Sequence, residues 1–166
     1  MNRMSRLVLA GIALAVAQLA PAHAARRVPV EDRTDVPVRN ADGKPLNLAD
    51  TRKAILIGAR QRAWQIKSDE PGMIRLEYAY RRGNAGATIE IPYKAGSYSL
   101  TYASSYGMAE KESGGRRTIK SAYLQWTRNL VNDIDRAAMS GLKEEQPGTQ
   151  RPQEPADDPD DKEPGK

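Results

Sequence analysis

Residues 74–102, IRLEYAYRRGNAGATIEIPYKAGSYSLTY, carry the pattern that decides the fold. Apolar and polar side chains alternate in three runs, which is typical of strands with one buried face and one solvated face. Turn residues at 83–86 and 94–96 interrupt the runs, so consecutive strands are expected to pair antiparallel. The side chains expected to face inward are Ile74, Leu76, Tyr78, Tyr80, Ala87, Ile89, Ile91, Tyr93, Tyr98, Leu100 and Tyr102.

Helical patterns flank this strand region. Asn47 is a good N-cap for a helix over residues 48–63, where apolar side chains recur at helical spacing. Residues 64–72 return to alternation and end in a Glu-Pro-Gly turn, which adds a strand before residue 74. A second helix is expected from about residue 119 to 137. The pattern therefore predicts an α+β fold of order α-β-β-β-β-α, a four-stranded antiparallel meander with both helices on one face.

Composition divides the chain into four parts: a signal over residues 1–24, an extended leader over 25–43, the α+β domain over 44–142, and a tail over 143–166. Lys and Arg outnumber Asp and Glu by 16 to 9 in the domain, whereas acidic residues outnumber basic ones by 8 to 4 in the tail. The tail has five prolines and few apolar residues, so we expect it to be disordered. A basic domain and an acidic tail can screen each other's charge.

The first 24 residues have the features of an export signal. Arg3 and Arg6 precede an apolar run over residues 7–20, and Ala22-His23-Ala24 has the small-x-small pattern of a signal peptidase site. A run of about 14 apolar residues is shorter than the roughly 20 that span a bilayer. We expect cleavage after Ala24 and a periplasmic or secreted domain that does not span the membrane.

Histidine and cysteine are missing from the expected mature chain, because the only histidine is His23 and there is no cysteine. Disulfides, His- or Cys-ligated metals, and Ser-His-Asp or Cys-His nucleophile systems therefore have no residues to form them. Without a cysteine near the cleavage site, lipid anchoring is not expected. We predict a non-enzymatic domain with no cofactor and no metal.

Three segments resemble a family of small uncharacterised envelope proteins and lipoproteins of Gram-negative bacteria. They are residues 62–72, 93–102 (YKAGSYSLTY) and 119–134 (IKSAYLQWTRNLVNDI), and the resemblance covers about 48–134. The family has no established activity, so it implies no functional residue. Many members have a lipobox cysteine where this chain has a peptidase site, and members commonly have Gly and His where this chain has Ala63 and Lys120.

Paired carboxylates are one candidate for chemistry. Glu77 and Glu90 are expected on the solvated face, and one strand register places them opposite each other, where they could act as acid and base. Another register pairs Arg81 with Glu90 as an ordinary cross-strand ion pair, and we favour this structural interpretation.

Tyrosine and tryptophan supply all the aromatic bulk, since phenylalanine is absent. Stacking on sugars or bases is one use for such rings, but the alternation directs most of them toward the core, which is the interpretation we favour. The residues are Tyr78, Tyr80, Tyr93, Tyr98, Tyr102, Tyr106, Tyr123, Trp64 and Trp126.

Basic residues provide a candidate anion site. A polar loop over residues 104–117 ends in Gly114-Gly115-Arg116-Arg117 and leads into the second helix, where backbone amides and the two arginines can bind an anion. A mobile, solvated loop is the alternative, and we favour that interpretation. The loop lacks a P-loop pattern, so nucleotide binding is not indicated. The candidate anion-binding residues are Arg116, Arg117, Lys120, Arg75 and Arg81.

The expected partner is an envelope protein or an anionic envelope component such as lipopolysaccharide, phospholipid headgroups or another polyanion. Specific nucleic-acid binding is not expected. The outer sheet face, including Lys67, or an uncovered edge strand can also receive a partner or a second copy by strand addition.

Overall fold

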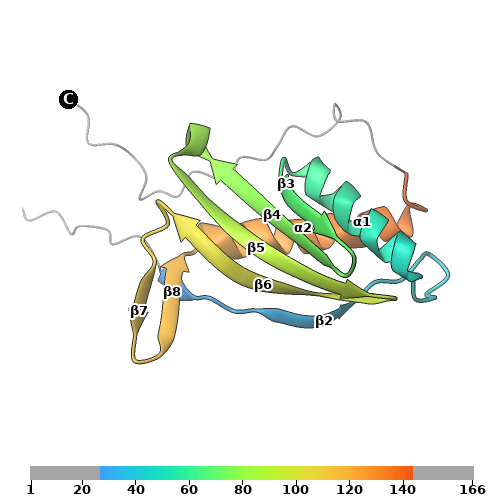
Figure 1. Cartoon of the computed structure of the whole chain (residues 1–166), viewed down its shortest axis with the longest axis horizontal. Coiled ribbons are helices and arrows are strands. Elements are labelled where there is room, and N and C mark those ends of the chain that lie inside the picture. The colour runs from blue at the N-terminus through green and yellow to red at the C-terminus, as the bar shows by residue number, and fades with distance from the viewer. Residues whose placement is uncertain (1–26, 144–166) are drawn as a thin grey trace, which may run out of the picture.

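The computed structural model describes residues 27–143 as two antiparallel sheets and two helices (Figure 1). The larger sheet contains β2 (Arg33–Pro37), β3 (Gln65–Glu70), β4 (Met73–Tyr80), β5 (Ala85–Lys94) and β6 (Ser97–Tyr106). The smaller sheet contains β1 (Arg27–Pro29), β7 (Lys111–Ser113) and β8 (Arg116–Lys120). The two α-helices are α1 (Leu48–Gln61) and α2 (Ala122–Met139), and a short 3-10 helix, η1 (Arg81–Gly83), follows β4. The signal, the first leader residues and the tail from residue 144 lie outside the described residues.

The α+β class is confirmed, but a sheet of only four strands is wrong. Strands β3, β4, β5 and β6 do form a meander in chain order, and β2 then adds to the open edge of β6. Val36 lies opposite Tyr98, and Asp32 accepts a hydrogen bond from the Tyr102 backbone N–H at 2.9 Å. Residues of the expected leader therefore belong to the fold, because their backbone groups pair with β6.

The smaller sheet corrects the prediction for residues 104–120. Strands β7 and β8 form a hairpin whose two-residue turn is Gly114-Gly115, and both glycines have left-handed φ values of 57° and 71°. Such φ values are characteristic of type I′ hairpin turns, which glycine favours. The double glycine therefore does not start the second helix; residues 116–120 form a strand, and α2 begins at Ala122.

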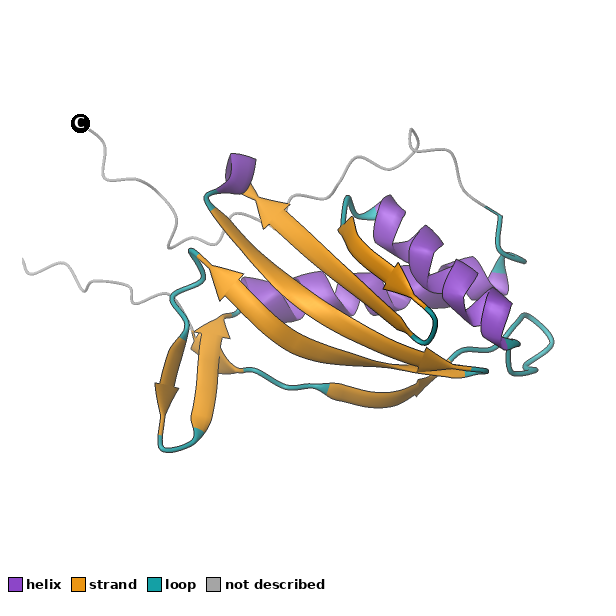
Figure 2. Cartoon of the chain, in the orientation of Figure 1, coloured by secondary structure: helices purple, strands orange, loops and turns teal. Residues whose placement is uncertain are grey.

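The core lies between the five-stranded sheet and the helices, which occupy the same side of that sheet (Figure 2). The predicted inward alternation is confirmed, since all eleven of those side chains are buried or half-buried. From α2, Tyr123, Trp126, Leu130 and Ile134 enter the same core. Strand β8 adds Ile119, so the smaller sheet shares this core.

The two helices approach closely at Gly58. A Cβ atom at this position would lie 2.7 Å from the backbone nitrogen of Ile134. Only glycine allows this separation without a shift of α2. At the other end of α1, the predicted N-cap is confirmed, because Asn47 Oδ1 accepts from the Asp50 backbone N–H at 2.8 Å. Over residues 27–143, no helix combines the length and apolarity that crossing a membrane requires.

Candidate functional site

Glu77 and Glu90 do not form a carboxylate pair. Strand β4 pairs with β5 so that Glu90 lies opposite Arg75 and Glu77 lies opposite Thr88, which is neither of the two registers considered from the sequence. Glu90 forms an ion pair with Arg75, and Glu77 lies 3.4 Å from Lys67 Nζ. The two carboxylates are therefore not directly opposed, and each has a cation as its partner.

The same ion pairs reduce the basic character of the larger sheet's outer face. Arg75 and Lys67 each have an acidic neighbour there, so neither presents an unneutralised charge. Arg81 lies in η1, and the placement of its side chain lies outside what the structure describes. Arg75 lies in β4 of the larger sheet, whereas Arg116, Arg117 and Lys120 lie in β8 of the smaller sheet. The predicted anion-binding residues therefore do not form a single site.

One face of the smaller sheet gathers four cations from three strands. Arg27 of β1 lies opposite Lys120 of β8, while Arg116 follows the hairpin turn and Lys111 of β7 lies opposite Thr118. Directly opposed residues share a face, and residues two and four apart on one strand share it too. We call this surface the basic face; it consists of Arg27, Lys111, Arg116 and Lys120, with the uncharged residues Pro29, Ser113 and Thr118 between them.

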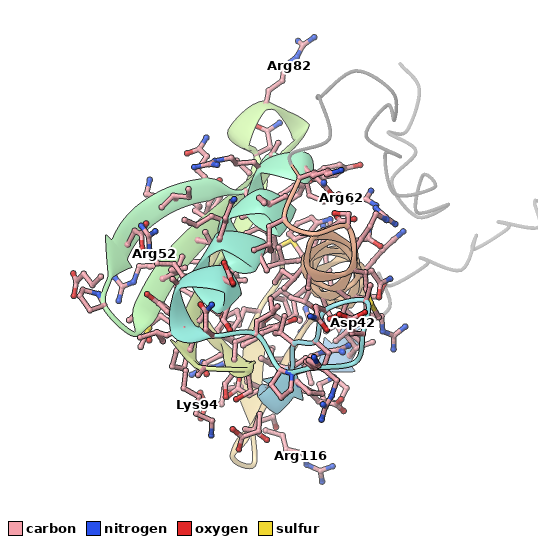
Figure 3. All side chains as sticks on the ribbon, turned by 90° about the vertical axis from the view of Figure 1, so that its right-hand side faces the viewer. Asp42, Arg52, Arg62, Arg82, Lys94 and Arg116 are labelled. Carbon is pink, nitrogen blue, oxygen red and sulfur yellow. The ribbon has the colours of Figure 1, made fainter. Side chains whose placement is uncertain are left out.

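The basic face has no internal neutralisation. Within residues 27–143, none of its four cations forms an ion pair with an acidic side chain. Arg27, Lys111 and Arg116 are exposed and Lys120 is half-buried. Figure 3 shows Arg116 extending away from the body of the domain. The strand spacings place all four cations within an area of about 13 Å by 10 Å. Arg27 and Lys120 are directly opposed like charges, and their repulsion destabilises the fold unless a counterion or ligand neutralises it.

Arg117 faces the opposite side of β8 and belongs to a different network. Its Nε lies 3.0 Å from Glu110 and its Nη2 lies 3.6 Å from Glu112. Its guanidinium carbon also lies 5.3 Å from the centre of the Tyr102 ring, which is a cation–π contact. The two consecutive arginines therefore do not act together, because adjacent strand residues point to opposite faces.

Tyr102 connects the hairpin to the larger sheet. Its hydroxyl donates to Glu110 at 2.5 Å and lies 2.8 Å from Ser105 Oγ. Burial, together with the hydrogen bond to Glu110, raises the pKa of Tyr102 to about 12. The phenol is therefore neutral at physiological pH, which suits a hydrogen-bond donor that braces the hairpin and not a general base.

A pocket of about 270 Å³ lies beside this network, between the β1–β2 connection and the hairpin. Asp32, Tyr102 and Arg117 contribute its polar groups, and Arg116 reaches its edge. The volume is below the range of most small-molecule sites, so it can receive a single group, such as an anionic headgroup or a side chain.

The aromatic residues are placed largely as a core. Tyr98 and Tyr123 are almost completely buried, and Trp126 packs in a tilted arrangement against Tyr78 and Tyr80, with ring centroids 4.8 Å and 5.8 Å apart. Tyr106, at 41% exposure, is the exposed member of the set. The described part of the chain also holds no group of three His, Cys, Asp or Glu side chains placed to bind a metal.

Two members of the basic face, Arg27 and Lys111, were not predicted from the sequence. The signal for Lys111 is the double glycine interpreted as a hairpin turn, which places residues 111–113 opposite 116–118. Comparisons with protein-family models, with curated proteins and with solved structures find no match for this chain. The candidate site therefore rests on the geometry of the smaller sheet alone.

Proposed function

We propose that this protein is a non-enzymatic binding domain of the cell envelope, and that its basic face docks onto an anionic envelope component. The observation that carries the proposal is the set of four cations on one small sheet face, without acidic partners among the described residues. Four cations within about 13 Å match a surface of closely spaced anions, of the kind that phospholipid headgroups or the phosphates of lipopolysaccharide present.

The arrangement of the remaining polar groups supports binding over catalysis. Arg117 is held by two glutamates, Tyr102 is a neutral donor, and Glu77 and Glu90 are each held by a cation. A hydrolase needs an activated nucleophile or a poised acid and base, and these groups stabilise one another instead. The expected envelope location, from the export signal, would bring such a domain next to anionic lipid.

The strands that carry the basic face are held in place by contacts with the rest of the fold. The hairpin is braced to the larger sheet through Tyr102 and Glu110, while Ile119 anchors β8 in the core. The four cations are therefore presented on rigid strands, which lowers the entropy cost of ordering them when a ligand binds.

Vesicle binding tests the proposal. The mature chain is mixed with vesicles of phosphatidylcholine alone or with added phosphatidylglycerol, and the bound fraction is measured by sedimentation at low and high salt. We expect binding that needs the anionic lipid and that weakens with salt. The double variant Lys111→Gln/Arg116→Gln removes two exposed cations, each worth about 1 kcal/mol near an anionic surface, and should bind about 30-fold more weakly.

A matched control removes the same charge elsewhere. Lys44 and Arg128 are exposed and lie outside the smaller sheet, so Lys44→Gln/Arg128→Gln should retain most of the binding. Equal losses in the two double variants would show that net charge alone governs binding and would refute a dedicated face. Binding to a heparin column without binding to vesicles would assign the face to a soluble polyanion, and binding to neither would reject the proposal.

A further inference from the structure

The residues after Lys143 carry the charge opposite to that of the basic face. In residues 144–166, Asp and Glu outnumber Lys and Arg by eight to three. Four of the acidic residues lie in one short stretch, Asp157-Asp158-Pro159-Asp160-Asp161. We call residues 157–161 the acidic block. Such a dense group of carboxylates is attracted to a surface of cations that have no acidic partner.

The acidic block matches the basic face in charge and in length. Pro155 and Pro159 disfavour helix at the residue before each of them and favour the extended polyproline II conformation, which rises about 3.1 Å per residue. At that rise, Asp157 and Asp161 are about 12 Å apart. The strand spacings hold the four cations of the basic face within about 13 Å by 10 Å. Four carboxylates of the block can therefore lie along the four cations.

The basic face needs an anion from outside the described residues. Arg27 and Lys120 are directly opposed like charges, and within residues 27–143 neither has an acidic partner. Basic side chains elsewhere are often paired already, as Lys94 is with Asp35 and Arg75 is with Glu90. An acidic segment of the same chain that reaches the basic face would relieve the repulsion between Arg27 and Lys120.

The tail is long enough to reach the basic face. Because Lys120 ends β8 and α2 begins at Ala122, the helix length, about 27 Å for 18 residues, separates the basic face from the end of α2 (Figure 1). Asp157 comes 14 residues after Lys143. An unstructured chain of 14 residues has an r.m.s. length of about 21 Å and a maximum of about 46 Å. The separation lies within this range, so the effective concentration of the block at the basic face is about millimolar.

We propose that the acidic block, residues 157–161, occupies the basic face of its own chain when no other anion is bound there. Its carboxylates pair with Arg27, Lys111, Arg116 and Lys120, and an external anion must displace them in order to bind. The tail is then an intramolecular competitor, which disfavours sparse anions and admits a densely charged surface. The inference rests on the geometry of the basic face and does not depend on which external anion replaces the block.

The absence of cysteine allows a direct test in the full mature chain, without vesicles or any other ligand. A nitroxide is attached to a single cysteine introduced as Ala156→Cys, and paramagnetic broadening of backbone amide signals is measured by NMR. We expect strong broadening at the amides of β7, β8 and Arg27, and little on α1. The broadening should be lost at about 1 M NaCl, where the Debye length is about 3 Å.

Paired variants of the labelled chain make the outcome specific. Lys111→Gln/Arg116→Gln should remove most of the broadening at the hairpin, whereas Lys44→Gln/Arg128→Gln, with the same loss of charge, should preserve it. A dispersed amide spectrum in each variant verifies that the domain is folded. Uniform weak broadening, broadening centred on α1, or an equal loss in the two double variants would overturn the proposal.

A second pair of variants tests the acidic block itself. Asp160→Asn/Asp161→Asn should weaken the broadening at the hairpin, whereas Glu144→Gln/Glu145→Gln, which removes the same charge next to the end of α2, should leave it in place. Mixing spin-labelled chain with isotope-labelled chain that has no nitroxide shows whose tail is bound. Broadening in that mixture as strong as within one chain would assign the basic face to the tail of a second copy and overturn the proposal.

Discussion

The Nε of Arg62 lies 2.6 Å from a carboxylate oxygen of Asp133, and this contact links the end of α1 to the middle of α2. The Asp133 side chain is only 1% exposed, whereas Arg62 is 22% exposed. Arg136, one turn further along α2, donates to the other carboxylate oxygen at 2.9 Å. A buried carboxylate with two arginine partners is thus placed beside the close crossing of the helices at Gly58, where its pairing helps to set their relative position.

Replacing Arg62 should destabilise the domain more than replacing Arg136. Arg62→Met keeps the aliphatic stem but leaves Asp133 buried with one partner, so we expect a loss of about 2 kcal/mol in the free energy of unfolding, measured by urea denaturation. Arg136 is 43% exposed, and Arg136→Met should cost less than about 1 kcal/mol. Equal losses would mean that the two arginines share the carboxylate evenly.

Gly58→Ala should be destabilising although alanine is the better helix former. The added Cβ would meet the Ile134 backbone nitrogen and its Cγ1 at 2.7 Å and 2.8 Å, so α2 must shift. Overpacking of this kind costs about 1–3 kcal/mol and outweighs a gain of about 1 kcal/mol in helix propensity. Lys53→Ala, on the exposed side of the same helix, should be neutral or slightly stabilising. A thermal unfolding midpoint for Gly58→Ala at or above the wild-type value would contradict the close crossing.

Two tyrosines that look alike in the sequence should respond differently to loss of the hydroxyl. Tyr98 is 1% exposed and its hydroxyl has no hydrogen-bond partner within the described residues, so Tyr98→Phe removes a buried, unpaired polar group and should be neutral or stabilising. Tyr102→Phe removes the hydrogen bond to Glu110 and should cost about 1 kcal/mol. Urea denaturation gives the free energy of unfolding of both variants. A larger decrease for Tyr98→Phe than for Tyr102→Phe would contradict this prediction.

The central meander could be predicted because the alternation of apolar and polar side chains along the sequence indicates which residues of each strand are buried. The same rule could not find β1, β2, β7 or β8. These strands have three to five residues, and their formation depends on the edge or hairpin partner each finds in the fold. Residues 33–37 contain Asp and Pro, which have low strand propensity, yet β6 offers them a free edge.

The candidate site shows a similar division. Arg116 and Lys120 were predicted as members of a basic cluster, but their partners come from strand pairing between distant parts of the chain, which places Arg27 opposite Lys120. Interpreting the double glycine as a helix start placed Arg116 and Arg117 together, whereas the hairpin places them on opposite faces. Likewise, the register of β4 and β5 decides which charge faces Glu90, and two-residue periodicity alone allows several registers.

Alkaline pH should destabilise the domain through its buried tyrosines. Burial raises the pKa of Tyr98 and Tyr123 above the usual value of about 10, and that of Tyr102 to about 12. The folded state therefore holds these protons at a pH where the unfolded chain releases them, so the stabilisation is complete below about pH 10 and is lost as the pH rises toward about 12. Urea denaturation between about pH 9 and pH 11 should show a falling free energy of unfolding, with tyrosinate absorbance appearing together with unfolding. The control is Tyr98→Phe, in which one raised pKa is removed and the decline should be shallower. Identical slopes for Tyr98→Phe and the unmodified chain would show that the decline comes from other groups.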